Sequence, residues 1–476
     1  MNANINLKDG LVKTKYYSSP IEQIQVSANI VSKTSSPKDV TISVLPISLL
    51  FEGQPFTVKA DIKNLQNIKY DISSAGTIDI GKIYSVFALK GYDLKGLIKA
   101  DLSLKGLQSD ATGGHYDRLF NSGTLSVKDL TLASDLFPKP FEIKDGNFHF
   151  DQDKMMFDKF HANYGSSDFQ LNGYLNNVIN YALKENAPLQ GQFDLKSKHL
   201  SIDEFMAFAT TDTGKTAVAS NAKPATKGVV IIPQNLAVNF NAFIDKATYN
   251  GLNIDSIKGQ MSVSNGVLKM TKSGFNIVGA PVLMDATYQS KSPNQALFDY
   301  HINAQNFNIK KAYDQITMLQ QIMTSAKNVQ GIVSLDYNLS GKLDENMMPI
   351  MPSLKGGGTL SLADVRLKGF RLMNEVSKAT DRDSLTNPNL KKVDIKSTIK
   401  NNIITIERTK MKIFGLRPRF EGQVSLDGRL NLKGRVGLPP LGIFGIPFSV
   451  TGTQTKPIVK LKRGSEADNL QETVEE

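Results

Sequence analysis

The amino-acid sequence predicts a mainly β protein: an elongated, repeat-built and curled antiparallel sheet that forms a groove, with about three short helices. Three observations predict this fold class. Apolar and polar residues alternate along many short stretches, as in a strand with one apolar face. Similar modules recur along the chain, and segments with a helical period are rare. We count about 30 candidate strands, so the helices cannot cover the sheet, which must close on itself or curl into a trough.

The recurring module begins with a glycine, continues as an alternating strand, and is followed by a turn and a second strand. Copies begin at Gly76, Gly123 and Gly358, and each starts with Gly-Thr and then alternates apolar and polar residues. Asp427 and Gly428 form a strong hairpin signal, because glycine tolerates the positive φ of such turns. Each module of a repeat array contacts only its neighbours, so an array can hold more strands than a compact sandwich.

In chain order, the pattern divides the protein into two β arrays. Residues 1–209 form the first array, which we expect to end in a helix, and residues 229–464 form the second. Between them, residues 210–228 are rich in Ala, Thr, Lys, Ser and Gly, which predicts a flexible linker. Residues 465–476 predict a disordered acidic tail.

Three segments predict helices. In residues 199–209, Ser201 can act as the N-cap, with Glu204 three positions further on, as in a capping box. Residues 310–327 have apolar side chains near helical spacing, and residues 372–379 form a shorter candidate.

Composition excludes several classes of function. The chain of 476 residues has no cysteine, which rules out disulfides and thiolate chemistry. Its net charge of +11 is spread over the whole length, without the basic runs interleaved with aromatics that nucleic-acid binding needs. A mildly basic surface is the plain interpretation, and attraction to anionic lipid headgroups is the sharper one. No segment reaches the ~20 apolar residues of a membrane-spanning helix, and no signal sequence begins the chain.

The chain offers no recognisable catalytic chemistry. His149 alternates with Phe148 and Phe150, so we expect it on the solvated face of a strand. The other histidines have no metal-type spacing, and no phosphate-binding glycine loop or nucleophile motif occurs. We therefore expect no enzyme, no catalytic residues, no metal and no cofactor.

A long apolar trough suits the acyl chains of a lipid. Two chains of about 15 CH₂ groups each gain roughly 24 kcal/mol when they leave water. Residues 310–327 have two interpretations that the sequence leaves open: a helix that covers a sheet end, or a gate that touches the lipid. The candidate lipid-contacting residues are Phe148, Phe150, Leu360, Leu362, Leu430, Leu432, Leu319 and Met323.

The modules at residues 123–127 and 358–362, and the C-terminal region 415–460 with Gly422 and Asp427, resemble the AsmA-like proteins of diderm bacteria. The resemblance implies a periplasmic lipid-transfer protein of the bridge-like type, which supports outer-membrane biogenesis. Its implied partners are phospholipid and the inner and outer membranes or envelope proteins, with no nucleic acid. The family's N-terminal anchor helix is missing from this chain, so the implied tether to the inner membrane would lie upstream.

A structural role is the alternative. A scaffold protein of the envelope could use its sheet edges to bind other assembly factors without carrying lipid. Its interior would then be filled with side chains, and replacing Leu360 or Leu430 by Asp would unfold it. Alternation does not distinguish a filled interior from an open one.

Overall fold

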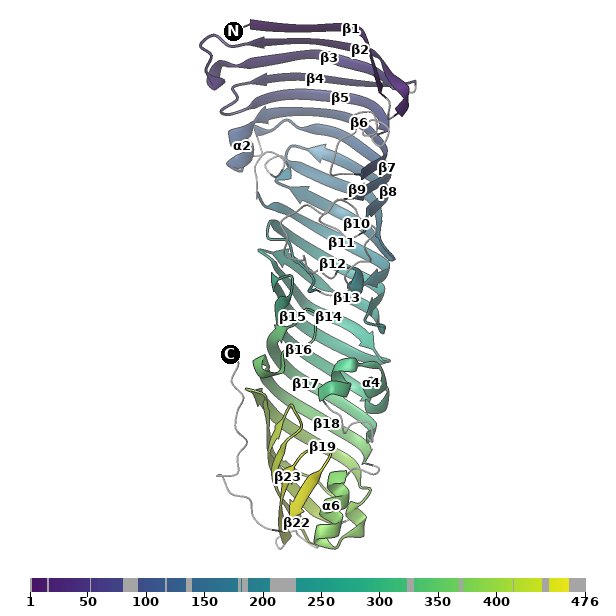
Figure 1. Cartoon of the computed structure of the whole chain (residues 1–476), viewed down its shortest axis with the longest axis vertical. Coiled ribbons are helices and arrows are strands. Elements are labelled where there is room, and N and C mark those ends of the chain that lie inside the picture. The colour runs from purple at the N-terminus through teal and green to yellow at the C-terminus, as the bar shows by residue number, and fades with distance from the viewer. Residues whose placement is uncertain are drawn as a thin grey trace.

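The computed structural model describes residues 2–14, 17–51, 53–79, 93–115, 118–133, 139–178, 181, 187–205, 228–322, 329–367, 371–413, 415–438 and 445–461. Together they form a single 24-stranded sheet that runs the length of the molecule (Figure 1).

The first twelve strands are β1 (Asn2–Thr14), β2 (Tyr17–Val31), β3 (Thr41–Phe51), β4 (Gln54–Lys63), β5 (Lys69–Asp79), β6 (Asp93–Leu107), β7 (Ser122–Ala133), β8 (Phe141–Asp151), β9 (Lys154–Tyr164), β10 (Ser167–Asn176), β11 (Leu189–Ser201) and β12 (Leu236–Tyr249). The remaining strands are β13 (Leu252–Ser264), β14 (Val267–Ile277), β15 (Ala280–Ser292), β16 (Gln295–Asn308), β17 (Val329–Leu343), β18 (Lys355–Leu367), β19 (Asn389–Lys400), β20 (Ile403–Lys410), β21 (Arg417–Ser425), β22 (Leu430–Gly437), β23 (Gly445–Gly452) and β24 (Pro457–Lys460). The α-helices in the described residues are α2 (Gln108–Thr112), α4 (Ile309–Gln315), α5 (Thr317–Ile322) and α6 (Arg371–Thr380), and short 3-10 helices cover Pro37–Asp39, Ile202–Phe205, Met351–Ser353 and Asp383–Leu385.

Each strand pairs with the next one along the chain, and all these pairs but one are antiparallel. The exception is the parallel pair β11–β12, which joins the two predicted arrays into one continuous sheet. A parallel pair requires a crossover connection, because both strands start at the same end of the sheet and the chain must return to that end after the first strand. The predicted linker forms most of this crossover, and its residues 210–227 lie outside the described part, as does the predicted tail, 465–476.

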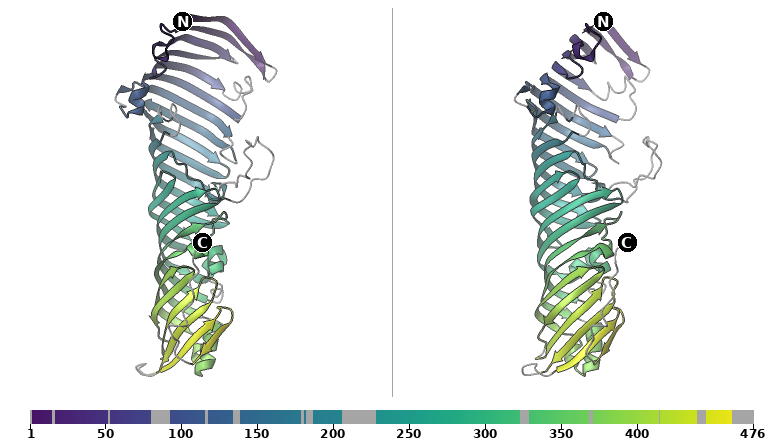
Figure 2. Two further views of the ribbon diagram at one scale, coloured as in Figure 1. Left: turned by 60° about the vertical axis from the view of Figure 1, so that its left-hand side comes forward. Right: turned by 90° about the vertical axis from the view of Figure 1, so that its left-hand side faces the viewer.

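Glycine at the start of a repeated module lets neighbouring strands approach closely. Gly123 on β7 has φ +126°, and a Cβ added there would collide with the carbonyl oxygen of Asp101 on β6. Glycines of this kind kink a strand and help a sheet to curl. The glycines noted in the sequence therefore contribute to the curvature visible in Figure 2, where the sheet is broad near the N-terminus and narrows toward β24.

Near the C-terminus the sheet curls so far that its last strand lies against a helix from earlier in the chain. Helix α6, which follows β18, packs on the last strand, β24. A cluster of buried side chains from β17 to β19, α6, β22 and β23 fills the space between them, and we call it the closed-end core. Its buried members are Ile309, Val333, Val365, Val376, Leu385, Leu390, Val393, Ile413, Leu416, Leu430, Leu432, Val436, Phe448 and Val450.

The helix predictions are confirmed in part. Residues 371–380 form α6, as expected from residues 372–379. The helix predicted over residues 310–327 is broken at Ile316 into α4 and α5, and residues 323–328 lie outside the described part.

The helix predicted over residues 199–209 is wrong where the structure describes it. Strand β11 continues to Ser201, and only a single 3-10 turn, Ile202–Phe205, follows. The reason is tertiary: Glu204 does not cap a helix but accepts hydrogen bonds from Lys139 Nζ at 2.6 Å, the Ser166 amide at 3.0 Å and Ser167 Oγ at 3.1 Å. The capping-box pattern was therefore used for a different contact.

Among the described residues, no helix combines the length and the apolar composition that crossing a membrane requires.

Candidate functional site: an apolar trough

One cross-strand row of apolar residues crosses almost the whole sheet. It contains one residue from each strand between β3 and β22, all directly paired in register, and only Tyr300 among them has a polar side-chain atom. The row, which we call the central row, is Leu49, Phe56, Gly76, Ala100, Leu125, Phe148, Phe157, Gly173, Phe193, Phe240, Met261, Met270, Ala286, Tyr300, Leu339, Gly356, Ile399, Ile404, Val424 and Leu430.

A second row runs beside it on the same face. Because side chains two positions apart share a face, this row reinforces the apolar surface. It consists of Leu102, Gly123, Phe150, Met155, Leu175, Gly191, Val238, Val263, Leu268, Tyr288 and Phe298. We call this surface the inner face. It is the concave side, since the closed-end core packs on it.

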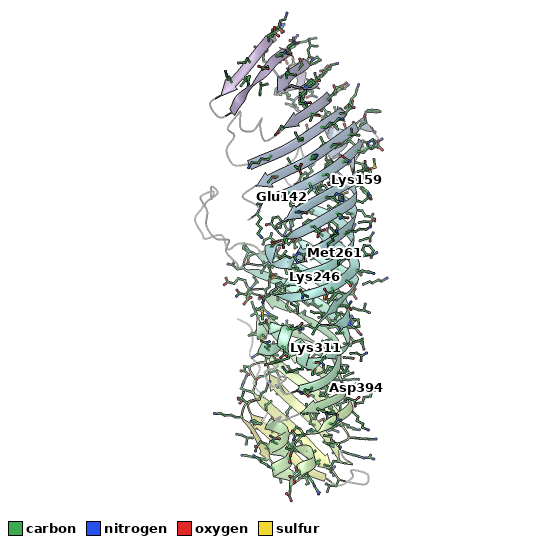
Figure 3. All side chains as sticks on the ribbon, turned by 90° about the vertical axis from the view of Figure 1, so that its right-hand side faces the viewer. Glu142, Lys159, Lys246, Met261, Lys311 and Asp394 are labelled. Carbon is green, nitrogen blue, oxygen red and sulfur yellow. The ribbon has the colours of Figure 1, made fainter. Side chains whose placement is uncertain are left out.

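The opposite, outer face is polar. His301 and Asn303 both contact Asp336 across the β16–β17 pair, at 2.9 Å and 3.1 Å. Asn241 donates to Asp194 at 2.9 Å across β11–β12. His149 is paired with Thr124 and Met156 on this face, as its alternation with the phenylalanines predicted. Figure 3 marks Met261 on the central row, and Lys159 and Asp394 are outer-face side chains in the same view.

Six of the eight predicted lipid-contacting residues lie on the inner face. Phe148 on β8 and Leu430 on β22 both belong to the central row, although thirteen strands lie between them in the sheet. Phe150 lies in the second row. Leu360 and Leu362 pack against the closed-end core, and Leu430 and Leu432 are part of it, each 6% exposed.

The remaining two candidates lie on the segment predicted as a packed helix or a gate. Leu319 is half-buried on α5, and Met323 lies outside the described residues. In the preceding helix, Ile309 and Ala312 are buried, and α4 packs on β17. The packing interpretation therefore holds for α4, and the structure leaves the gate interpretation untested.

In the middle of the sheet, aromatic rings cover the inner face. Phe157 contacts Phe148 and Phe193 edge to face, with ring centroids 4.8 Å and 5.0 Å away, and Phe193 stacks on Phe240 at 5.9 Å. These rings come from β8 to β12 and form part of one buried cluster. The cluster bridges the parallel pair, so the inner face continues unchanged across the crossover.

The end of the crossover covers the inner face further along. Residues 228–232, which we call the strap, pack on Tyr288 and Phe298 of the second row, and Val229 is fully buried there. The Tyr288 hydroxyl donates to the Val230 carbonyl at 2.8 Å, and the Val229 amide donates to the Pro293 carbonyl at 2.8 Å. Sequence reasoning missed the strap, because its short apolar run directly follows the residues that predict a linker.

The trough is therefore open at one end and filled at the other. Toward the N-terminus, the inner-face side chains Ile5 and Leu7 of β1 are 52% and 44% exposed. Beside the strap, burial raises the pKa of Tyr300 to about 12, with a smaller contribution from Tyr249. The accessible apolar surface thus lies mainly between β1 and the strap.

In the described part of the chain, no group of three or more His, Asp or Glu side chains is arranged to hold a metal ion. Comparison of the chain with protein-family models, with curated proteins and with solved structures finds no match.

Proposed function

We propose that this protein shelters the acyl chains of phospholipids on its inner face and lets them move along it. The unbroken central row is the observation that carries the proposal. At roughly 4.8 Å per strand, the part of the row between β3 and β14, which ends before the strap, extends about 50 Å, more than twice the length of one acyl chain. A lipid could move from strand to strand along such a surface without returning its chains to water.

The energetics favour continuous contact. Each CH₂ sheltered from water contributes about 0.8 kcal/mol, so a single polar gap that exposed even a few of them would be a barrier to movement. The central row has no charged residue, and its paired neighbours are apolar or glycine. Soluble proteins seldom leave a large apolar patch uncovered, so the open N-terminal section is expected to hold a ligand.

The proposal places the acyl chains between β1 and the strap. Here the inner face consists of half-buried side chains such as Ala28, Val44, Ala60 and Ile72, which pair in register across β2 to β5. The closed-end core, in contrast, already covers Leu430 and Leu432 with protein atoms. We propose that it acts as a folded end cap.

The resemblance to AsmA-like proteins extends the proposal to location and partners. On this basis we propose a periplasmic protein, tethered to the inner membrane by a segment upstream of this chain. It would carry phospholipid in support of outer-membrane biogenesis, together with envelope proteins at its two ends. The continuous curled sheet is compatible with such a bridge-like carrier.

The scaffold alternative is favoured by one observation, the edge of β1. Within the described residues β1 pairs only with β2, so its other edge can accept a strand from another protein. In that case the protein would bind its partner while its inner face carried no lipid.

Native mass spectrometry of gently purified full-length chain distinguishes the two functions. The lipid-carrier proposal expects mass additions of phospholipid that organic extraction removes and that are identified in the extract. Protein that is folded and free of lipid after purification from membranes would refute the carrier and leave the scaffold.

A further inference from the structure

A second candidate site lies on the outer face of the closed end. Strands β20 to β23 enclose a half-open pocket of about 380 Å³, which we call the basic pocket. Its lining includes the side chains of Arg408, Arg419, Glu421, Lys433, Arg435 and Pro447.

The register of the strands brings these residues together. Arg419 pairs with Arg435, which in turn pairs with Pro447, and Glu421 pairs with Lys433. They alternate with the buried closed-end residues of the same strands, such as Val436, so they point to the opposite side of the sheet. The basic pocket is therefore separate from the apolar trough.

Positive charge dominates the pocket, with four cationic side chains and one carboxylate. The single carboxylate is already occupied: Arg408 Nε and Nη2 donate to the two oxygens of Glu421 at 2.9 Å and 3.0 Å. These bonds hold the pKa of Glu421 below its usual value, and the charges of Arg419 and Lys433 add to the effect. Among the described residues, neither Arg419 nor Lys433 forms an ion pair of its own.

The guanidinium group of Arg435 occupies space that is left open by Gly445. Its Nε lies 2.8 Å from the position that a Cβ on Gly445 would occupy, so any larger residue at 445 would displace the guanidinium. Guanidinium groups match the tetrahedral oxygens of phosphate in geometry and charge, and a neighbouring ammonium adds a point charge. The pocket thus has the cations and the space for an anionic group, and it has no free carboxylate to repel one.

From this arrangement we infer that the basic pocket binds a phosphate group. Two sources share this chemistry: a phosphate in the headgroup of an anionic lipid at a membrane surface, and free phosphate in solution. In the first case the pocket would hold the closed end of the protein against a membrane.

The test uses the full chain and two probes. One probe is inorganic phosphate in isothermal titration, and the other is co-sedimentation with vesicles of phosphatidylcholine, with and without phosphatidylglycerol. The double variant Arg419→Gln and Lys433→Gln should weaken binding about 25-fold, since each basic residue near an anionic surface contributes about fivefold. The control variant Lys258→Gln and Lys269→Gln removes two exposed outer-face charges from β13 and β14 and should leave binding unchanged.

A third variant predicts the opposite sign. Glu421→Gln removes the only carboxylate and releases Arg408, so phosphate binding should become about fivefold tighter. Thermal melting of each variant checks that the sheet is intact.

Each outcome decides the inference. If inorganic phosphate binds and the double variant binds it more weakly, the inference is supported, and free phosphate is a sufficient ligand. Binding only to the vesicles that contain phosphatidylglycerol, with the same dependence, supports it and assigns the headgroup. No binding of either probe, or binding that the double variant leaves unchanged, overturns it. Lipid carried in the trough is measured separately by native mass spectrometry, so the two proposals can fail independently.

Discussion

The rings of Phe148 and Phe157 meet edge to face across the β8–β9 pair, with centroids 4.8 Å apart and planes at 87°. Phe157 makes a second such contact with Phe193 at 5.0 Å, so it links neighbouring members of the central row. Edge-to-face rings add about 0.5–1.5 kcal/mol to the energy of burial alone. Aromatic contacts of this kind stabilise the sheet from β8 up to the first strand of the parallel pair, β11.

Phe157→Ala should therefore destabilise the protein by about 3–5 kcal/mol, because it removes a buried ring and leaves a cavity. Urea unfolding followed by circular dichroism measures the change. Phe243→Ala is the matched control: this ring is exposed on the outer face of β12, and its loss should cost about 0.5 kcal/mol or less. Equal effects of the two substitutions would show that the inner face is not where the stability lies.

Lipid loading should depend on the face that a substitution changes. Ile72→Asp places a charge on the half-buried inner face of β5, where an acyl chain would have to desolvate it. We expect a marked loss of bound phospholipid in native mass spectra. Ser73→Asp adds the same charge one residue away, on the exposed outer face, and should load like the unaltered protein. Identical loading of both variants would contradict acyl chains on this part of the sheet.

The ionisation of the Glu204 carboxyl makes the stability of the folded protein depend on pH. Burial raises the pKa of Glu204, but hydrogen bonds from Lys139 and Ser166 outweigh this effect and bring the pKa below the usual 4.5. A lowered pKa means that the folded state holds the carboxylate ionised, so the stabilisation is complete above about pH 4.5 and is lost as the pH falls further.

Glu204→Gln should accordingly lower the free energy of unfolding by about 1–2 kcal/mol at neutral pH, and the difference from the unaltered protein should shrink below pH 4.5. Urea midpoints measured across this range provide the comparison. Glu142→Gln, at an exposed pair with Lys144, is the control and should have little effect at any pH. A pH-independent difference for Glu204→Gln would argue against the ionised carboxylate as the cause.

Docking of the strap should depend on the Tyr288 hydroxyl. Tyr288→Phe removes the hydrogen bond to the Val230 carbonyl, which contributes about 1 kcal/mol, so the Val229 amide should exchange with solvent about fivefold faster. Hydrogen exchange read by mass spectrometry measures this protection. Tyr337→Phe removes a comparable hydroxyl contact with Ser397 and should leave the strap unchanged. Unaltered exchange at Val229 in the Tyr288 variant would mean that apolar packing alone holds the strap.

Alternation predicted the fold class and most of the trough, because a period of two assigns every side chain to a face once a strand is recognised. Phe148 and His149 are the clearest example, since they were placed on opposite faces and lie there. Alternation of apolar and polar residues occurs in parallel and antiparallel strands alike. The sequence therefore did not indicate that β11 and β12 pair in parallel.

Contacts between distant segments were out of reach. Glu204 satisfies a local helix signal but binds Lys139 and Ser166 instead, and nothing near it in the sequence indicates these partners. The basic pocket was missed for a similar reason. Arg419 and Arg435 each occur in short alternating stretches, and they form a cluster only through the register of β21 and β22.

The stacking of all strands along one axis has a mechanical consequence. Backbone hydrogen bonds between strands run roughly along the long axis of the molecule, so tension applied to its two ends would open one ladder at a time, like a zipper. The ladder with the last strand is short, because β24 pairs through residues 457–460 only in the described part of the chain. Helix α6 packs against this strand and so stabilises the end of the sheet where strand separation under tension would begin.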